Sequence, residues 1–357
     1  MAPPTISVVL PMYNAEQYIA EAVASILSQT YQDFELIVVD DGSLDRSASI
    51  VRGFNDTRIF IVSMPHSGLV SALNCGISKS LGRYIARMDA DDVAHPERFI
   101  RQVEYLDRCH NVHLLGTWFT EFSDHTTFPR NPPSSDKLIK RQLFFNNQFG
   151  HGTVMIRRSI LTQSGLYRPE LFPAEDYDLW LRISEVADVA NLPMSLYYWR
   201  KSNAQISQQM RYLALQRTRT AARLAIQRAL GGSDSLGHSI DFTFNPGASA
   251  LGLIGYAQGA LSMGHYYLAK SLLLRAADVI PNGTSPRSLL IKALCTIQSL
   301  QAVSRPVRRF GRSLIASPSV ASMLSSDPVR SRLPGGILEV LTSRAQSRSG
   351  AHHHNGT

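Results

Sequence analysis

The first hundred residues alternate between short apolar runs and longer segments in which apolar residues recur every three or four positions. The short runs at 6–10, 34–39, 58–64 and 83–87 are rich in β-branched residues, which is typical of buried strands. The segments between them, at 16–29, 44–54 and 67–82, carry the helical period. Strands that alternate with helices of this length predict βαβ units and a parallel sheet.

Two details refine the predicted helices. In segment 16–29 the residues Ile19, Val23 and Ile26 share one face, which predicts an amphipathic helix packed on the sheet. Gly82 follows the third helical segment. We expect it to cap that helix, because glycine readily adopts the left-handed conformation in which many helices end.

Polar stretches follow three of the four predicted strands, at residues 11–16 (PMYNAE), 40–43 (DDGS) and 89–92 (DADD). The carboxyl ends of parallel strands meet at one edge of a sheet, and ligands bind in the crevice outside that edge. The last stretch crowds Asp89, Asp91 and Asp92 into four positions. Two unit charges about 5 Å apart repel by roughly 3 kcal/mol at an effective dielectric constant near 20. A solvated acidic turn would relieve that repulsion, and so would a divalent cation bound together with substrate phosphates.

Two common phosphate-binding sequences are absent. The chain has no Walker sequence, GxxxxGK[ST], and no GxGxxG after its first predicted strand. A P-loop NTPase and a standard dinucleotide dehydrogenase are therefore disfavoured. The pattern favours a phosphorylated substrate held through a metal ion rather than by a glycine-rich loop.

The order and spacing of three longer stretches carry a family resemblance: residues 6–47, 68–99 and 174–183. Together they resemble the family 2 glycosyltransferases with the GT-A fold. The resemblance covers about residues 5–210 and implies an α/β domain, a Rossmann-like mixed sheet flanked by helices, with a C-terminal helical extension. We accordingly expect a catalytic domain at 1–210, a helical extension at 211–303 and a basic, partly disordered tail at 304–357.

The resemblance also implies a nucleotide-sugar donor, with a UDP-sugar expected, and inversion at the anomeric carbon. Matched position by position, Pro11, Tyr13 and Glu16 correspond to the first nucleotide-contacting loop of the family. Asp41 corresponds to the aspartate that reads the base in uridine-binding members.

The remaining matched positions concern the metal and the acceptor. Asp89 and Asp91 correspond to the D-x-D pair, with Asp91 expected to bind Mn²⁺ or Mg²⁺ and Asp89 to bind the ribose or the metal. Asp176 corresponds to the general base. These residue types suit the implied chemistry, because a metal ion offsets the charge that develops on the leaving diphosphate. A single carboxylate can then deprotonate the attacking hydroxyl.

Several of these positions allow another interpretation. Tyr13 can be a packing aromatic residue, and Glu16 an acid favoured by the dipole of the following helix. Asp92 is expected to hydrogen-bond the turn rather than bind a ligand. Asp178 remains an alternative base, and His151 can lie near the acceptor or serve a structural role.

One position departs from the family pattern. Many relatives carry a histidine after the last core strand, in a Tyr-Arg-x-His sequence, where it contacts the diphosphate or the metal. Here the run is YYWRKS, and Ser202 stands at that place. Either Arg200 or Lys201 offsets the diphosphate charge instead, or this contact is absent.

Charge and cysteine content indicate the cellular compartment of the protein and the surfaces that it contacts. Residues 1–210 hold 19 Lys and Arg against 23 Asp and Glu, whereas residues 211–357 hold 17 against 5. Arginines interleaved with apolar residues after position 304 predict contact with an anionic membrane surface. A solvated basic tail, or arginines paired with the acidic catalytic domain, would explain the same pattern. The scarcity of aromatic residues among the arginines disfavours nucleic acid. The sequence predicts a cytoplasmic protein that is peripheral at the membrane face. Its three cysteines are scattered, it shows no signal-peptide pattern, and no apolar run reaches about 18 residues.

Two classes of function follow. The first is an inverting glycosyltransferase that acts on a glycan or lipid-linked acceptor in cell-surface polysaccharide or lipid-linked glycan synthesis. The alternative is a catalytically degenerate GT-A domain that binds a nucleotide-sugar or a partner. The intact D-x-D and AED sequences favour the enzyme. A nucleotidyltransferase is disfavoured, because the loop after the first strand lacks glycine and basic residues.

Overall fold

The computed structural model describes residues 3–123, 126–143, 146–201, 210–229 and 236. The chain divides into two units, Met1–Phe244 and Asn245–Thr357, and all described residues belong to the first. The predictions for Ser202, for most of the helical extension and for the basic tail with its membrane contact lie outside the described residues. Among the helices that are described, none is long and apolar enough to cross a membrane.

The described unit alternates strands and helices over its first half and then becomes irregular. Its strands are β1 (Ile6–Met12), β2 (Phe34–Asp40), β3 (Ile59–Ser63), β4 (Tyr84–Arg87), β5 (Val93–Ala94), β6 (Val112–Phe122), β7 (Thr127–Arg130), β8 (Met155–Arg157) and β9 (Asp188–Arg200). Its α-helices are α1 (Ile19–Leu27), α2 (Ser47–Arg52), α3 (Leu69–Lys79), α4 (Arg98–Arg108), α5 (Asp136–Leu143), α6 (Ile160–Ser164), α7 (Glu175–Val186) and α9 (Arg211–Ala229). Two short 3₁₀ turns are η1 (His151–Thr153) and η2 (Pro169–Leu171).

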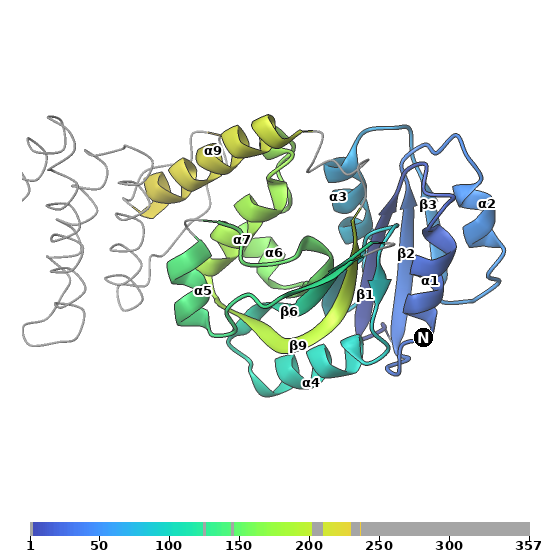
Figure 1. Cartoon of the computed structure of the whole chain (residues 1–357), viewed down its shortest axis with the longest axis horizontal. Helices are drawn as coiled ribbons and strands as arrows, with labels where there is room; N and C mark the ends of the chain where they lie inside the picture. The colour runs from blue at the N-terminus through green and yellow to red at the C-terminus, as the bar shows by residue number, and fades with distance from the viewer. Residues whose placement is uncertain (1–2, 124–125, 144–145, 202–209, 230–235, 237–357) are drawn as a thin grey trace, which may run out of the picture. The chain divides into compact units, whose positions relative to one another are not determined.

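The strands of the described residues form one mixed sheet in the order β3-β2-β1-β4-β8-β6-β9-β5, with β7 also paired to β6 (Figure 1). The strands β3, β2, β1 and β4 are parallel, as the βαβ pattern predicts. β8 is antiparallel to both β4 and β6, which makes the sheet mixed beyond β4. The sheet therefore has the α/β class and the mixed character expected from the sequence.

Both faces of the parallel half are covered by helices. Every residue of β1 and of β2 is buried, which explains why both strands read as continuous apolar runs. Val8 and Leu10 share a core cluster with residues of α1 and α4. Val9 faces the other way, toward Gly76 of α3. Figure 1 shows α1 and α3 on opposite sides of these strands.

The third helix ends earlier than predicted, and Gly82 is not its cap. α3 ends at Lys79 with Ser80 as its C-cap residue. The backbone N–H of Gly82 instead donates to Ser7 Oγ at 2.8 Å. A Cβ atom on Gly82 would lie 2.5 Å from the Ser7 nitrogen and 2.7 Å from the Ile6 carbonyl carbon. Glycine is required here because two backbones approach closely, and not because of a left-handed conformation.

This close approach predicts the cost of a side chain at Gly82. Gly82→Ala should lower the free energy of unfolding by about 1–3 kcal/mol, because the added methyl group meets backbone atoms that cannot move independently. Denaturant unfolding measures the change. The matched control is Gly53→Ala, at the end of α2, where φ is −67° and the nearest atom to a new Cβ is 3.2 Å away. Equal effects at the two glycines would contradict the account of Gly82.

Candidate active site

A stacked aromatic pair lies beyond the carboxyl ends of β1 and β3. The Tyr13 ring, 44% exposed, stacks on the His66 ring with their centroids 4.1 Å apart. Beside it, the buried Asp41 carboxylate accepts hydrogen bonds from the backbone N–H groups of Ser67 (2.8 Å) and Gly68 (2.9 Å). His66 Nδ1 lies 2.9 Å from the same carboxylate. An exposed ring beside a fixed carboxylate can stack on a planar heterocycle and accept a hydrogen bond from it.

Side chains tie the loop after β1 to the loop after β2. The N–H of Asn14 donates to Ser43 Oγ at 3.1 Å. Glu16 accepts from the backbone N–H of Arg46 (3.1 Å) and from its Nε (3.2 Å). Glu16 thus joins the two loops in this arrangement, while Pro11 is buried within β1.

The three carboxylates that follow β4 have different partners. Asp89 pairs with the guanidinium group of Arg87. Asp92, 1% exposed, accepts from the Tyr197 hydroxyl at 2.8 Å and from the backbone N–H of Arg200 at 2.7 Å. Among the described residues, no other side chain donates a hydrogen bond to the carboxylate of Asp91. Asp92 therefore turns inward, as predicted from the sequence, but both of its partners belong to β9 and not to its own turn.

Burial dominates the electrostatics of this turn. It raises the pKa of Asp91, and it raises the pKa of Asp92 to about 7, where the charge of Asp91 adds to the effect. The nearby charge of Arg87 opposes both increases. A cation beside Asp91 would favour its ionised form. No cluster of three or more His, Cys, Asp or Glu side chains suited to a metal is present in the described part of the chain, so a cation there would need further ligands from a substrate.

Arg200 and Lys201 are placed differently. The Arg200 Nε donates to the backbone carbonyl of Asp91 at 2.8 Å, and its guanidinium pairs with Glu21. Lys201 is exposed, and its backbone N–H donates to the Phe122 carbonyl at 2.8 Å. Arg200 and Lys201 were the two candidates to take the place of the family's histidine. Of these two, Arg200 lies against the acidic turn.

A second acidic group opens α7. Asp176 accepts a hydrogen bond from Asn147 Nδ2 at 2.7 Å. Burial raises the pKa of Asp176, and it raises that of Glu175 to about 8 with help from the charge of Asp176. A helix N-terminus favours ionised carboxylates, so burial outweighs the helix dipole at these two residues. Carboxyl groups with raised pKa values can exchange protons near neutral pH.

His151 is a half-buried neighbour of this acid pair. Its Nδ1 lies 4.0 Å from Glu175 Oε1, and its Nε2 lies 3.0 Å from the Tyr167 hydroxyl. Burial, followed by the charge of Arg87, lowers the pKa of His151 well below its usual value, so the ring is neutral near pH 7. Its ring also packs edge-on against Trp180, which is fully buried in the core.

Asp178 is built into the core rather than into the site. It is fully buried, and its carboxylate pairs with both Arg168 and Arg182. Burial acts to raise its pKa, but the charges of Arg182 and Arg168 outweigh that effect and the pKa is lowered. Asp178 thus anchors α7, and Asp176 remains the better-placed base of the two.

Arg87, Asn147 and Tyr197 are among the residues of the site that were not singled out from the sequence, as are His66, Tyr167 and Glu175. Of the first three, only Arg87 carried a local signal, because an arginine that ends a fully buried strand is unusual. Asn147 and Tyr197 reach the acidic groups from segments distant in sequence, 29 and 105 residues from the partners they bond.

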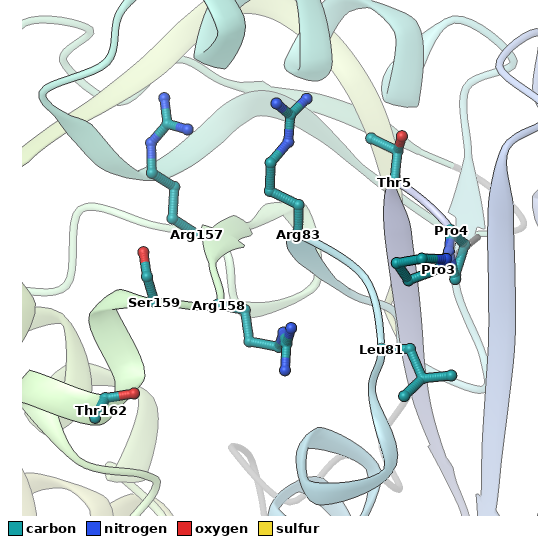
Figure 2. A pocket seen from close by; sticks show the side chains of 9 residues that line it. All are labelled: Pro3, Pro4, Thr5, Leu81, Arg83, Arg157, Arg158, Ser159 and Thr162. Carbon is teal, nitrogen blue, oxygen red and sulfur yellow. The ribbon is translucent and has the colours of Figure 1, made fainter.

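A separate pocket of about 610 Å³ lies at the opposite end of the sheet (Figure 2). Its lining includes Thr5, just before β1, together with Arg83, Arg157 and Arg158. Arg157 donates to the carbonyl groups of Val112 and Cys109 and so holds the fold together. None of the residues matched to the family's site lines this pocket.

Comparisons with known sequences identify the family. The chain matches the model of the family described as Glycosyl transferase family 2 over residues 7–165. It is 33% identical over 219 residues to an uncharacterized glycosyltransferase of Haemophilus influenzae, covering 57% of this chain and 68% of the relative. It is 34% identical over 194 residues to the amylovoran biosynthesis glycosyltransferase AmsE of Erwinia amylovora, covering 52% of this chain and 73% of AmsE.

Two solved structures share the fold. S. aureus TarS 1-349 in complex with UDP has a TM-score of 0.55 at 19% identity, with coverage of 99% of this chain and 94% of TarS. Mannosyltransferase PcManGT from Pyrobaculum calidifontis, in complex with GDP-Man and Mn²⁺, has a TM-score of 0.50 at 17% identity, with coverage of 91% and 88%. The mixed sheet with its flanking helices is therefore of the GT-A type. The chain belongs to glycosyl transferase family 2, and it is a glycosyltransferase.

The raised pKa of Glu175 predicts a pH-dependent effect on stability. In the folded protein the pKa of Glu175 is about 8 against a usual 4.5. Between about pH 5 and pH 8 the folded protein therefore keeps a proton that the unfolded chain loses, and the free energy of unfolding falls as the pH rises. Glu175→Gln removes this loss of stability. The stability of the variant relative to the wild type should therefore increase over that pH range and be constant below pH 4.

Denaturant unfolding at a series of pH values measures this difference. Glu104→Gln, at an exposed position of α4, controls for the loss of a carboxylate elsewhere on the protein. If the difference in free energy of unfolding between Glu175→Gln and the wild type is constant from pH 4 to pH 9, Glu175 is not a buried, unpaired carboxyl group.

Proposed function

We propose that this enzyme transfers a sugar, with inversion at the anomeric carbon, from a UDP-sugar to a hydroxyl group of a surface polysaccharide or lipid-linked glycan. The observation that carries the proposal is that two acidic groups matched to the family have different surroundings: Asp89 pairs with the buried Arg87, whereas Asp176 accepts a hydrogen bond from Asn147. The turn at 89–92 supplies the first group, and the start of α7 supplies the second. Two carboxylate groups in distinct surroundings can serve the two ends of one displacement.

The donor end is assigned from the loops after β1 and β2. The exposed Tyr13 ring would stack on the base, and Asp41 would accept a hydrogen bond from it. TarS has been solved with UDP and UDP-GlcNAc, and PcManGT with GDP-Man, which supports a nucleoside-diphosphate sugar as the donor class. The choice of uridine as the nucleoside of the donor rests on the match of Asp41 to the family.

A divalent cation fits the acidic turn. Asp91 would hold it, because its carboxylate is half-buried and receives no hydrogen bond from another described side chain, and Asp89 would contact the ribose or the metal. When bound, such a cation supplies Lewis-acid stabilisation of the departing diphosphate. PcManGT in complex with Mn²⁺ supports this choice of metal. The chain's own contribution is to keep Asp89 and Asp92 fixed, through Arg87 and Tyr197.

The acceptor end is assigned to α7. Asp176 would accept the proton of the attacking hydroxyl group, with Asn147 holding one carboxylate oxygen in place. The raised pKa makes Asp176 a stronger base than an ordinary aspartate. The name of AmsE, an amylovoran biosynthesis enzyme, supports a glycan hydroxyl as the acceptor class.

The donor site predicts the behaviour of Asp91→Ala. This variant should fold normally but bind UDP at least about tenfold more weakly in Mn²⁺, which corresponds to roughly 1.4 kcal/mol. Titration calorimetry with UDP, with and without Mn²⁺, measures the affinity, and a panel of nucleotide-sugars then identifies the donor. Asp107→Ala, at a surface carboxylate paired with Arg83, is the control. If wild type and Asp91→Ala bind UDP equally and a chelator changes neither, the metal assignment fails.

The base assignment predicts the behaviour of Asp176→Asn. Turnover of the donor identified above should fall by at least about 10²-fold, because the variant loses its proton acceptor. The affinity for UDP should be nearly unchanged, because Asp176 is assigned to the acceptor. Release of UDP measures turnover, and calorimetry measures affinity. A parallel loss of UDP affinity would move Asp176 into the donor site and leave the base unassigned.

A further inference from the structure

Arg87 occupies an unusual position for a charged residue. It is the last residue of β4, its side chain is 5% exposed, and its backbone N–H donates to the Val154 carbonyl at 3.1 Å. β4 is the strand at which the parallel half of the sheet meets the antiparallel strand β8. A guanidinium group buried there has lost most of its hydration, which is costly unless anions surround it.

Anions do surround it, on two sides. On one side the guanidinium pairs with Asp89, and its charge acts on Asp91 and Asp92. On the other side the backbone N–H of Arg87 bonds Val154, which directly follows the turn that bears His151, and His151 Nδ1 lies 4.0 Å from Glu175 Oε1. The charge of Arg87 also lowers the pKa values of Glu175 and Asp176 against the effect of burial. The other polar groups near that acid pair are Asn147, His151 and Tyr167, and none of them is a cation near neutral pH.

Several buried polar side-chain atoms have no hydrogen-bond partner among the described residues, and they include a donor and an acceptor of this site. The donor is Nε of Arg87, and the acceptor is Oε2 of Glu175. Buried polar groups in folded proteins are almost always paired, so this donor and this acceptor are suited to a polar ligand group such as a sugar hydroxyl.

A second buried arginine nearby shows how a purely structural arginine is bonded. Arg98, fully buried at the start of α4, donates to the carbonyl groups of Arg87 (2.9 Å) and Val154 (3.3 Å) and to Gln102 Oε1 (3.1 Å). Its partners are neutral, whereas Arg87 pairs with a carboxylate and retains an unpaired Nε. The two arginines therefore differ in role although both are buried.

We propose that Arg87 is a positioning residue shared by both halves of the active site. Its guanidinium group orients the Asp89 carboxylate on the donor side, and on the acceptor side its buried charge is the counter-ion of Asp176, and of Glu175 once that residue is ionised. The inference rests on the proposed function, because the names of the two sides come from it. The charge arrangement itself is independent of which sugar is transferred.

The donor half is tested by calorimetry with UDP in Mn²⁺ on the full chain. Arg87→Met should weaken UDP binding at least about tenfold, because Asp89 loses its partner and the turn gains net negative charge against an anionic ligand. Arg87→Lys should recover part of the loss, since it keeps the charge but not the planar donor geometry. Arg98→Met, the matched control, should lower the melting temperature while leaving UDP affinity within about twofold.

The acceptor half is tested without any ligand, by a double-mutant cycle on thermal stability. Arg87→Met, Asp176→Asn and the double variant are melted at pH 5 and at pH 9. If Arg87 is the counter-ion, the double variant should melt at least about 2 °C higher at pH 9 than the sum of the single effects predicts. The non-additivity should be smaller at pH 5, where the acid pair carries less charge. In the cycle with Arg87→Lys the non-additivity at pH 9 should disappear, because the charge is retained.

The outcomes separate the inference from the proposed function. If the wild type itself does not bind UDP in Mn²⁺, the donor assignment fails, whatever the cycle gives. If the wild type binds and Arg87→Met binds equally well, Arg87 does not orient the donor side. Additive melting temperatures at both pH values would overturn its role as counter-ion, even if Arg87→Met weakens UDP binding.

Discussion

The cost of burying carboxylates at one edge of a sheet governs the architecture of this site. Five acidic side chains gather there: Asp89, Asp91, Asp92, Glu175 and Asp176. Each loses hydration on folding, and like charges nearby add to the cost. The fold offsets this with one buried cation, Arg87, and with neutral donors from Asn147 and Tyr197. The mixed topology makes this possible, because β8 returns beside β4 and continues from the 3₁₀ turn that bears His151.

The cost of burial is offset more fully for some carboxylates than for others. This difference separates structural acids from candidate functional acids. Asp92 and Asp178 receive two or more hydrogen bonds or ion pairs each and are sealed from solvent. Asp91, which is half-buried, and Glu175, which is buried, receive no hydrogen bond from a described side chain, and burial raises the pKa values of both, as it does for Asp92. Acids that the protein itself leaves incompletely paired are the ones suited to a cation, a substrate or a proton.

A second ion network holds the acceptor side in place. Asp178 joins Arg168 and Arg182 inside the core, in the same first turn of α7 as the acid pair. Further along α7, Glu185 pairs with Arg228 of α9 at 2.8 Å, which ties the last described helix to the same element. Such buried pairs add little net stability, but removing one partner is costly. Their effect is to fix where α7 begins, and hence where Glu175 and Asp176 lie relative to β4.

The amino-acid sequence by itself determined the succession of strands and helices, the parallel half of the sheet and the edge at which the polar loops gather. It also carried the family resemblance, through Asp41, the DADD turn and the AED segment. These features are local, because the period of apolar residues reports the faces of a single strand or helix. Tertiary structure decided the rest: that Gly82 serves backbone contact rather than a helix cap, that β9 supplies the partners of Asp92, and that Arg87 acts on Glu175 and Asp176. Those outcomes depend on burial and on charges brought together from segments far apart in the chain, and no local pattern encodes the distance between two such segments.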